Sequence, residues 1–249
     1  MTAMKAAPLV PVVLKDDAFA PPDAEAYYVV AGNGFFLTRR TDLYTATVPV
    51  GGGVPGLRPQ EARLDLRLPR RLPRPMIESA LGFFRAVWDR WEGEAILVVF
   101  YAPPTAGRSV RYRLAAPPQK IRGRMEHGRF RAELRLEYGA CPRPGDEWRK
   151  LGTFHSHGSL GARHSMIDEV DERWETGLHV TAGHVKASPP EFEAAFVVSG
   201  ARFAIPVDDV LERTRAARGW PKAWMERIEV IEERWEHDAH AESGYPYSY

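Results

Sequence analysis

The first 75 residues carry short apolar segments that are separated by turn-forming residues. Segments rich in Tyr, Phe, Val and Thr span residues 26–30, 34–40 and 43–50, with Gly-Asn-Gly and Thr-Asp between them. This stretch holds 10 of the 21 prolines, and the fixed φ and missing N–H donor of proline disfavour helix. We therefore predict a small antiparallel meander, followed by a connector over residues 51–75.

The pattern changes to a helical period after Pro75. Apolar side chains recur at helical spacing from Ile77 to Trp91. Pro75 suits the first turn of this helix, and Gly93 suits its C-terminal cap. The nearly continuous apolar run over residues 94–101 is typical of a central strand with both faces covered.

Alternating and mixed patterns fill the rest of the chain. Apolar and charged residues alternate over residues 110–114 and 130–138, which predicts half-exposed strands. Further strands are expected at residues 151–155, 178–186, 192–198 and 201–205, and helices at residues 166–175, 208–218 and 222–235. This order predicts an α/β (α+β) fold with helices on a mixed sheet, rather than an all-β sandwich or a helical bundle.

Composition and charge narrow the class of protein. The 34 Lys and Arg residues balance 33 Asp and Glu residues to a net charge of +1, whereas nucleic-acid-binding proteins usually carry a basic excess. A single cysteine, Cys141, excludes an internal disulfide framework. The apolar run near the N-terminus is too short and too interrupted by proline for a signal peptide or a membrane span. We expect a soluble cytoplasmic protein that binds neither nucleic acid nor membrane.

The segment from Thr153 to Asp168 holds the most informative polar residues. His155 and His157 lie two apart at the end of a predicted strand, so both imidazoles can reach one point. Asp168 follows His157 after ten intervening residues, at the start of a predicted helix, and can supply a third ligand. Two imidazoles and a carboxylate are a hydrolytic zinc set with a fourth position open for water. Ser165, one helical turn before Asp168, can donate a hydrogen bond to a developing oxyanion.

These residues carry a resemblance to a known family. His155-x-His157, with Ser165 and Asp168 downstream, resembles the JAMM motif of the MPN metalloproteases. The resemblance covers about residues 75–205 and implies a cytidine-deaminase-like core with one catalytic zinc. It also implies a glutamate on an early strand as general base, and Glu94 occupies that place after the predicted helix. The chain then divides into an N-terminal β-rich extension and linker (1–74), the JAMM/MPN core (75–206), and C-terminal helices with a tail (207–249).

The substrates of this family indicate what such a site would cut. The resemblance implies hydrolysis of isopeptide or peptide bonds after the Gly-ending tail of a ubiquitin-like protein, in deconjugation or precursor trimming. Stand-alone bacterial members are often encoded with activating and conjugating enzymes in anti-phage systems, which implies those enzymes as further partners. The chain lacks the prolines that the RadC branch carries after the second histidine, and this favours the deubiquitinase-like branch.

Three other functions stay open at this point. The same residues would serve a peptidase that trims a sulfur-carrier protein of the ubiquitin fold. A non-catalytic MPN scaffold would only assemble partners, although such scaffolds typically lose ligands and none is lost here. A RadC-like protein of DNA metabolism is disfavoured by the neutral charge and the missing prolines. The N-terminal meander would dock a substrate or partner enzyme in one reading, and only extend the sheet in the other.

Other residues compete for roles in the site. Glu78 competes for the role of general base, although an acid near the start of a helix is explained by the helix dipole. His164 could be a spare ligand, but we interpret it as a loop residue at the rim. Cys141 could be a nucleophile, although no ordered partner motif surrounds it. His179 and His184 face opposite sides of a predicted strand, and we interpret both as structural.

Overall fold

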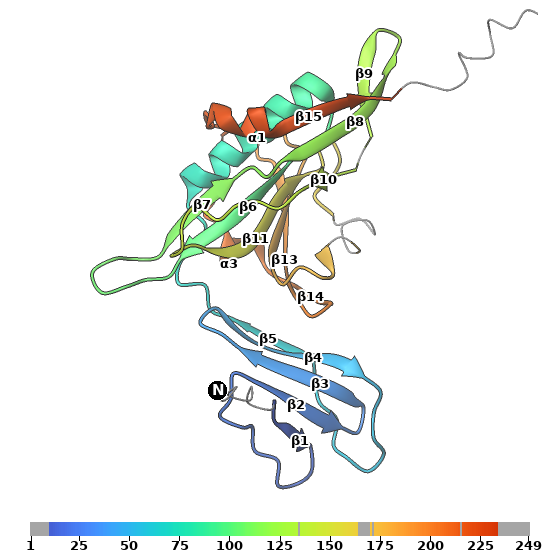
Figure 1. The fold of residues 1–249 in the computed structure, drawn as a ribbon, viewed down its shortest axis with the longest axis vertical. Helices are drawn as coiled ribbons and strands as arrows, with labels where there is room; N and C mark the ends of the chain where they lie inside the picture. Colours follow the sequence, from blue (N-terminus) through green and yellow to red (C-terminus); the bar gives the residue numbers. More distant parts are fainter. Residues whose placement is uncertain (1–9, 134, 164–169, 171, 215, 234–249) are drawn as a thin grey trace, which may run out of the picture.

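A computed structural model describes residues 10–133, 135–163, 170, 172–214 and 216–233 of the 249-residue chain. The described residues form an α+β architecture that consists mostly of strands, arranged in three sheets with few helices (Figure 1). The predicted α+β class is therefore confirmed. None of the helices in this described part has the length and hydropathy that crossing a membrane requires.

The N-terminal sheet contains the predicted meander and two further strands. Its five strands follow the sequence order: β1 (Val12–Leu14), β2 (Ala26–Ala31), β3 (Gly34–Arg40), β4 (Tyr44–Gly51) and β5 (Arg63–Leu66). The antiparallel pairing of β2, β3 and β4 confirms the meander. β5 lies inside the stretch predicted as a connector. A strand forms there because Leu64 and Leu66 pack against the main core while β5 pairs with β4.

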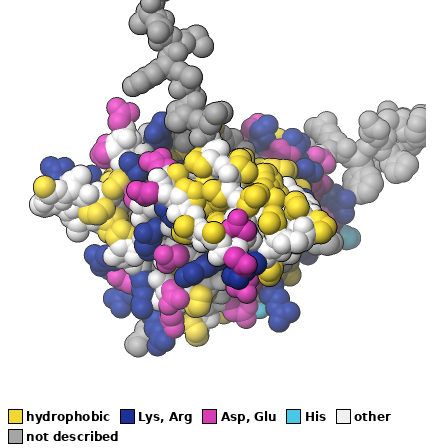
Figure 2. Space-filling view, turned by 90° about the horizontal axis from the view of Figure 1, so that it is seen from below, with side chains coloured by type: hydrophobic (Ala, Val, Ile, Leu, Met, Phe, Trp, Pro, Cys, Tyr) yellow, Lys and Arg dark blue, Asp and Glu magenta, His cyan; other side chains and the backbone are white. Residues whose placement is uncertain are grey.

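This sheet is apolar on both faces. On one face, Val29 and Phe36 are buried in a small core of their own. On the other face, Val12 and Leu14 are 59% and 54% exposed, and Val12 lies in register with Tyr28 of β2. Figure 2, which views the molecule from the end formed by this sheet, shows hydrophobic side chains gathered on the exposed surface. Leu37 and Val48, which are in register with Tyr28 on the same face, pack against the main core, so Val12 and Leu14 are the exposed end of an apolar face.

The six-stranded sheet holds the central strands. Its order is β14-β13-β12-β11-β6-β7, with β6 (Ile96–Ala102), β7 (Arg111–Ala115), β11 (Arg149–Ser156), β12 (Gly177–Gly183), β13 (Glu191–Val198) and β14 (Ala201–Ala204). β11 runs parallel to β12 and antiparallel to β6. Every residue of β6 is buried, as predicted for a central strand.

The long helix α1 (Arg74–Trp91) covers one face of this sheet and confirms the predicted helix. Phe84 of α1 packs edge-on against Phe154 of β11, with ring centroids 5.3 Å apart. The helix ends at Trp91, as predicted, but its C-terminal cap is Glu92 and not Gly93, because Glu92 adopts the left-handed conformation, with φ 53°. The chain then turns directly into β6, so α1 and β6 fix the short segment that contains Glu94.

The third sheet corrects the prediction for the C-terminal part of the chain. It contains β8 (Gln119–Glu126), β9 (Arg129–Ala132), β10 (Glu137–Tyr138) and β15 (Ile228–Glu232). The helices predicted at residues 208–218 and 222–235 are wrong, because the structure has the four-residue helix α3 (Val207–Val210) and the 3-10 helix η1 (Lys222–Arg227), followed by β15. The β-branched residues Ile228, Val230 and Ile231 pair in parallel with β8, and such long-range pairing overrides the local helical spacing.

Candidate functional site

The site is built on the C-terminal end of β11. His155 is the last residue but one of this strand, and His157 continues its direction because its backbone N–H donates to Ala182 O at 2.9 Å. Alternate residues of an extended chain point to the same side, and the two imidazoles do so here. His155 Nε2 and His157 Nε2 lie 3.1 Å apart. Both side chains are buried, at 2% and 5% exposed.

The partners of the two Nδ1 atoms indicate which nitrogen of each ring carries the proton. His157 Nδ1 lies 3.2 Å from the backbone carbonyl oxygen of Gly161, which can only accept a hydrogen bond. His155 Nδ1 lies 3.8 Å from Glu172 Oε1, and a carboxylate also only accepts. The carbonyl of Gly161 assigns the proton of His157 to Nδ1, whereas the Glu172 carboxylate is too far from His155 Nδ1 for a hydrogen bond and favours a proton there through its charge alone. With a proton on each Nδ1, the two Nε2 lone pairs face one another, and Thr181 Oγ1 lies 3.4 Å from Nε2 of His155.

This geometry fits a zinc ion. Two imidazole nitrogens bound to one tetrahedral zinc at 2.0–2.1 Å lie about 3.3 Å apart, close to the observed 3.1 Å between the Nε2 atoms. At this separation the two Nε2 atoms either share one proton in a hydrogen bond or hold a cation between their two lone pairs. A carbonyl or carboxylate on the second ring nitrogen is also the usual surrounding of a zinc-bound histidine. His155 and His157 therefore have the chemistry and the spacing of metal ligands.

Ser165 and Asp168, the other residues of the predicted zinc site, are outside the described residues. The same is true of His164 and of most of the helix predicted at residues 166–175. Within the described residues, no group of three His, Cys, Asp or Glu side chains could hold a metal ion. The third ligand of the predicted set, Asp168, thus stays a prediction, and so does the oxyanion donor Ser165.

The residue that follows Glu94 is hydrogen-bonded to the segment that bears the two histidines. It is half-buried and comes two residues before β6. Ala95 N donates to Ser156 Oγ at 3.2 Å, and Ser156 N donates to Ala95 O at 3.0 Å. Ser156 separates His155 from His157, so these two hydrogen bonds fasten the Glu94 segment to the part of β11 that bears the imidazoles. The prediction that Glu94 opens β6 is two residues early, and its role as general base stays a prediction.

Gln119 is a residue of this site that the sequence did not indicate. Its side chain is buried, and its Oε1 accepts a hydrogen bond from Ile96 N at 2.9 Å. Its Nε2 donates to Ile96 O at 3.1 Å. One side chain thus satisfies both backbone groups of the first residue of β6. No local signal in the sequence reveals this contact, because Gln119 and Ile96 are 23 positions apart.

We expect Gln119→Ala to destabilise the fold. The substitution leaves two buried backbone groups without a partner, and each such group costs about 1–3 kcal/mol, so the free energy of unfolding should fall by about 2–6 kcal/mol. Urea denaturation followed by far-UV circular dichroism measures the change. Gln60→Ala is the matched control, because the Gln60 side chain donates only to Glu61 O at an exposed position. Equal effects of the two substitutions would contradict the role of Gln119.

Glu78 and His179, two residues that competed for a role in the site, make contacts that stabilise the fold. Glu78 is buried in α1 and forms ion pairs with Arg74 at 3.5 Å and Arg218 at 3.3 Å. His179 is fully buried, and its Nε2 lies 2.9 Å from the backbone carbonyl oxygen of Glu175. Burial lowers the pKa of His179, so the ring is neutral near pH 7. These contacts agree with the structural interpretation of both residues.

Two further residues show no feature of a catalytic group. The imidazole of His184 is 46% exposed and faces Glu191 at 3.6 Å. Burial raises the pKa of the Cys141 thiol, whereas a nucleophilic cysteine needs a lowered pKa. A role for Cys141 as nucleophile is therefore disfavoured by its surroundings.

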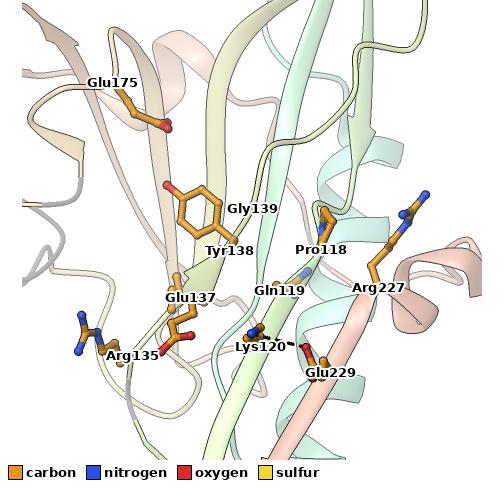
Figure 3. A pocket seen from close by; sticks show the side chains of 11 residues that line it. Pro118, Gln119, Lys120, Arg135, Glu137, Tyr138, Gly139, Glu175, Arg227 and Glu229 are labelled. Atoms are coloured by element: carbon orange, nitrogen blue, oxygen red, sulfur yellow. Dashed lines mark ion pairs between the residues drawn. The ribbon is translucent and has the colours of Figure 1, made fainter.

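A cavity of about 660 Å³ lies between β8, β10 and β15. Tyr138 and Glu175 border it on one side, and Arg227 and Glu229 on the other, with an ion pair between Lys120 and Glu229 (Figure 3). Neither His155 nor His157 lines this cavity. It approaches the site through Gln119, whose side chain lines it and also holds the start of β6. The cavity is therefore next to the Glu94 segment rather than over the imidazoles.

Comparison with other proteins adds no assignment. Neither the protein-family models nor the curated proteins give a match to this chain. The observation that bears most on function is the arrangement of His155 and His157 at the end of β11.

Proposed function

We propose that this chain is a zinc-dependent isopeptidase or peptidase of the JAMM type, which cuts a ubiquitin-like protein after its C-terminal glycine. The observation that carries the proposal is the 3.1 Å approach of His155 Nε2 and His157 Nε2. The carbonyl of Gly161 and the charge of Glu172 favour a proton on each Nδ1, and in that tautomer both Nε2 atoms can bind one cation. The JAMM-like spacing adds Asp168 as the third ligand in this proposal, with zinc bound by two imidazoles and one carboxylate.

Each residue of the proposed site has a distinct task. Zinc, when bound, supplies a Lewis acid that polarises a carbonyl and lowers the pKa of a coordinated water towards about 7. Glu94 accepts a proton from the attacking water and later passes it to the leaving amine. The Ser165 hydroxyl donates a hydrogen bond to the oxyanion that develops on the substrate carbonyl. His155, His157 and Asp168 hold the metal and take no part in proton transfer.

Burial of the site supports a substrate without side chains near the scissile bond. The two imidazoles are 2% and 5% exposed, so a bulky side chain beside the scissile carbonyl would collide with the walls around them. A Gly-rich tail is narrow enough to approach, and extended segments bind along strand edges. The cavity between β8, β10 and β15 is next to the Glu94 segment, and we propose that the tail lies there. The activating and conjugating enzymes of the same system are the further partners in this proposal.

Cleavage of a fusion protein tests the proposed function. The zinc-loaded protein is incubated with the ubiquitin-like protein of its own gene neighbourhood, which carries a short C-terminal extension, and the products are analysed by mass spectrometry. We expect cleavage directly after the terminal glycine of the tail, and loss of cleavage when a chelator removes zinc. The matched control is the same fusion with leucine in place of that glycine, which should resist cleavage. A folded, zinc-loaded protein that cuts no such fusion would point to the non-catalytic scaffold instead.

A further inference from the structure

A buried carboxylate lies behind the two histidines. Glu172 is 6% exposed, and its Oε2 accepts a hydrogen bond from Arg202 of β14 at 2.5 Å. Its Oε1 faces two imidazoles, with His179 Nδ1 at 3.4 Å and His155 Nδ1 at 3.8 Å. A carboxylate buried to this degree needs a charged partner to stay ionised, and the Arg202 guanidinium provides one. The sequence analysis assigned no role to Glu172 or to Arg202.

The hydrogen bonds of His179 decide which imidazole offers a proton to Glu172. His179 Nε2 lies 2.9 Å from the carbonyl oxygen of Glu175, so Nε2 carries the proton of this neutral ring. His179 Nδ1 then has only a lone pair, and it accepts from the Thr153 hydroxyl at 2.8 Å. His179 therefore has no N–H directed at Glu172. Of the two imidazoles near Oε1, His155 is therefore the one whose Nδ1 can carry a proton beside the carboxylate, at 3.8 Å and without a hydrogen bond between the two groups in this structure.

We propose that Glu172 is a positioning residue that keeps the proton on His155 Nδ1 and thereby leaves the Nε2 lone pair for the metal. The negative charge beside Nδ1 favours the tautomer with the proton on that atom. Carboxylates in this position orient the ring and increase the basicity of the ligating nitrogen. Arg202 holds the carboxylate in place from the far side. The effect on zinc rests on the proposed function, whereas the effect on the tautomer of His155 does not.

Zinc affinity of Glu172→Gln is the first measurement. Loss of such a second carboxylate typically lowers metal affinity by about 10–100-fold, and we expect a fall of that size in competition with a chromophoric chelator. Glu175→Gln is the matched control, since Glu175 lies three positions later and its side chain pairs with Lys150 rather than with a histidine. This control should bind zinc as the wild-type protein does. If Glu172→Gln does not fold, Glu172→Asp replaces it, because it keeps the charge but withdraws it from His155, and we expect a several-fold loss.

The tautomer of His155 is the second measurement, and a purely structural role of Glu172 would not change it. Nitrogen-15 NMR of the histidine rings reports which nitrogen carries the proton, in metal-free and in zinc-loaded protein. We expect Nδ1–H in the wild-type protein and in Glu175→Gln, and a shift towards Nε2–H in metal-free Glu172→Gln. An unchanged tautomer together with unchanged zinc affinity would overturn the role of Glu172 while the proposed function stands. A changed tautomer in a protein that binds no zinc would remove the proposed function and leave the role of Glu172.

Discussion

Glu94→Gln is expected to reduce the rate of cleavage by about 10²–10⁴-fold, the usual contribution of a general acid–base group. The amide has nearly the size of the carboxylate but cannot accept a proton, so the step that activates water is lost. Zinc content and unfolding midpoint should stay at wild-type values, because Glu94 is not a ligand in the proposed set and is only half-buried. Cleavage of the ubiquitin-like fusion and metal analysis on the same preparation provide the two readouts.

Glu78→Gln is the control that tests the choice between the two glutamates. The Glu78 carboxylate is buried and pairs with Arg74 and Arg218, so this substitution should lower stability while the folded protein retains its rate of cleavage. The reverse result, an inactive Glu78→Gln protein and an active Glu94→Gln protein, would show that Glu94 is not the base. The hydrogen bond from Ala95 N to Ser156 Oγ would then have no part in catalysis.

The largest effect on metal content is expected from His155→Ala combined with His157→Ala. In the proposed set this double variant retains only the Asp168 carboxylate, and a single carboxylate does not hold zinc in competition with water. Zinc per chain should fall from about one to background, as measured by plasma mass spectrometry after dialysis. Each single substitution leaves two protein ligands and should also lose zinc under the same dialysis.

His184→Ala is the matched control for these variants. The His184 imidazole is exposed and faces Glu191, so its removal should leave zinc content unchanged. Zinc retained at one equivalent by the His155→Ala/His157→Ala protein would contradict the assignment of these two ligands. Zinc lost from His184→Ala as well would indicate that the metal is held at a different place.

Local patterns predicted the elements whose hydrophobic period is strong. The apolar positions from Ile77 to Trp91 lie in α1, and the apolar run predicted over residues 94–101 contains most of the fully buried strand β6. The meander was predicted from segments rich in Tyr, Phe, Val and Thr and from the turn residues between them, and β2, β3 and β4 follow it closely. In each of these elements the local preference and the tertiary packing favour the same structure.

Elements that depend on distant partners were missed. The residues of β15 were predicted as helix, because Ile228 and Ile231 are three positions apart, a helical spacing. Both lie instead in a strand that pairs with β8, more than a hundred positions earlier in the sequence. β8 itself is rich in charged residues, and only Gln119, Ile121 and Gly123 are buried along it. Propensity within a short window does not report such long-range pairing, so neither strand was predicted.

In the candidate site, too, local spacing was predictive and contacts between distant residues were not. The two-residue spacing of His155 and His157 predicted that their imidazoles converge, because alternate residues of a strand share a face. Gly161, which lies beside His157 Nδ1, is four positions away in the sequence, whereas Glu172 and Arg202 are more distant along the chain. Those contacts arise from the packing of loops and of β14 around β11, and no spacing rule in the sequence indicates them.

X-ray absorption at the zinc edge tests the central claim most directly. The wild-type protein is loaded with one equivalent of zinc, and excess metal is removed before the spectrum is recorded. We predict a four-coordinate zinc with two imidazole nitrogens and two oxygens at about 2.0–2.1 Å, with the multiple scattering that histidine rings produce. The two imidazoles are those of His155 and His157, so the double variant should retain no zinc and give no zinc-edge signal above background. A zinc surrounded by oxygen alone, or a protein that retains no zinc, would contradict the account.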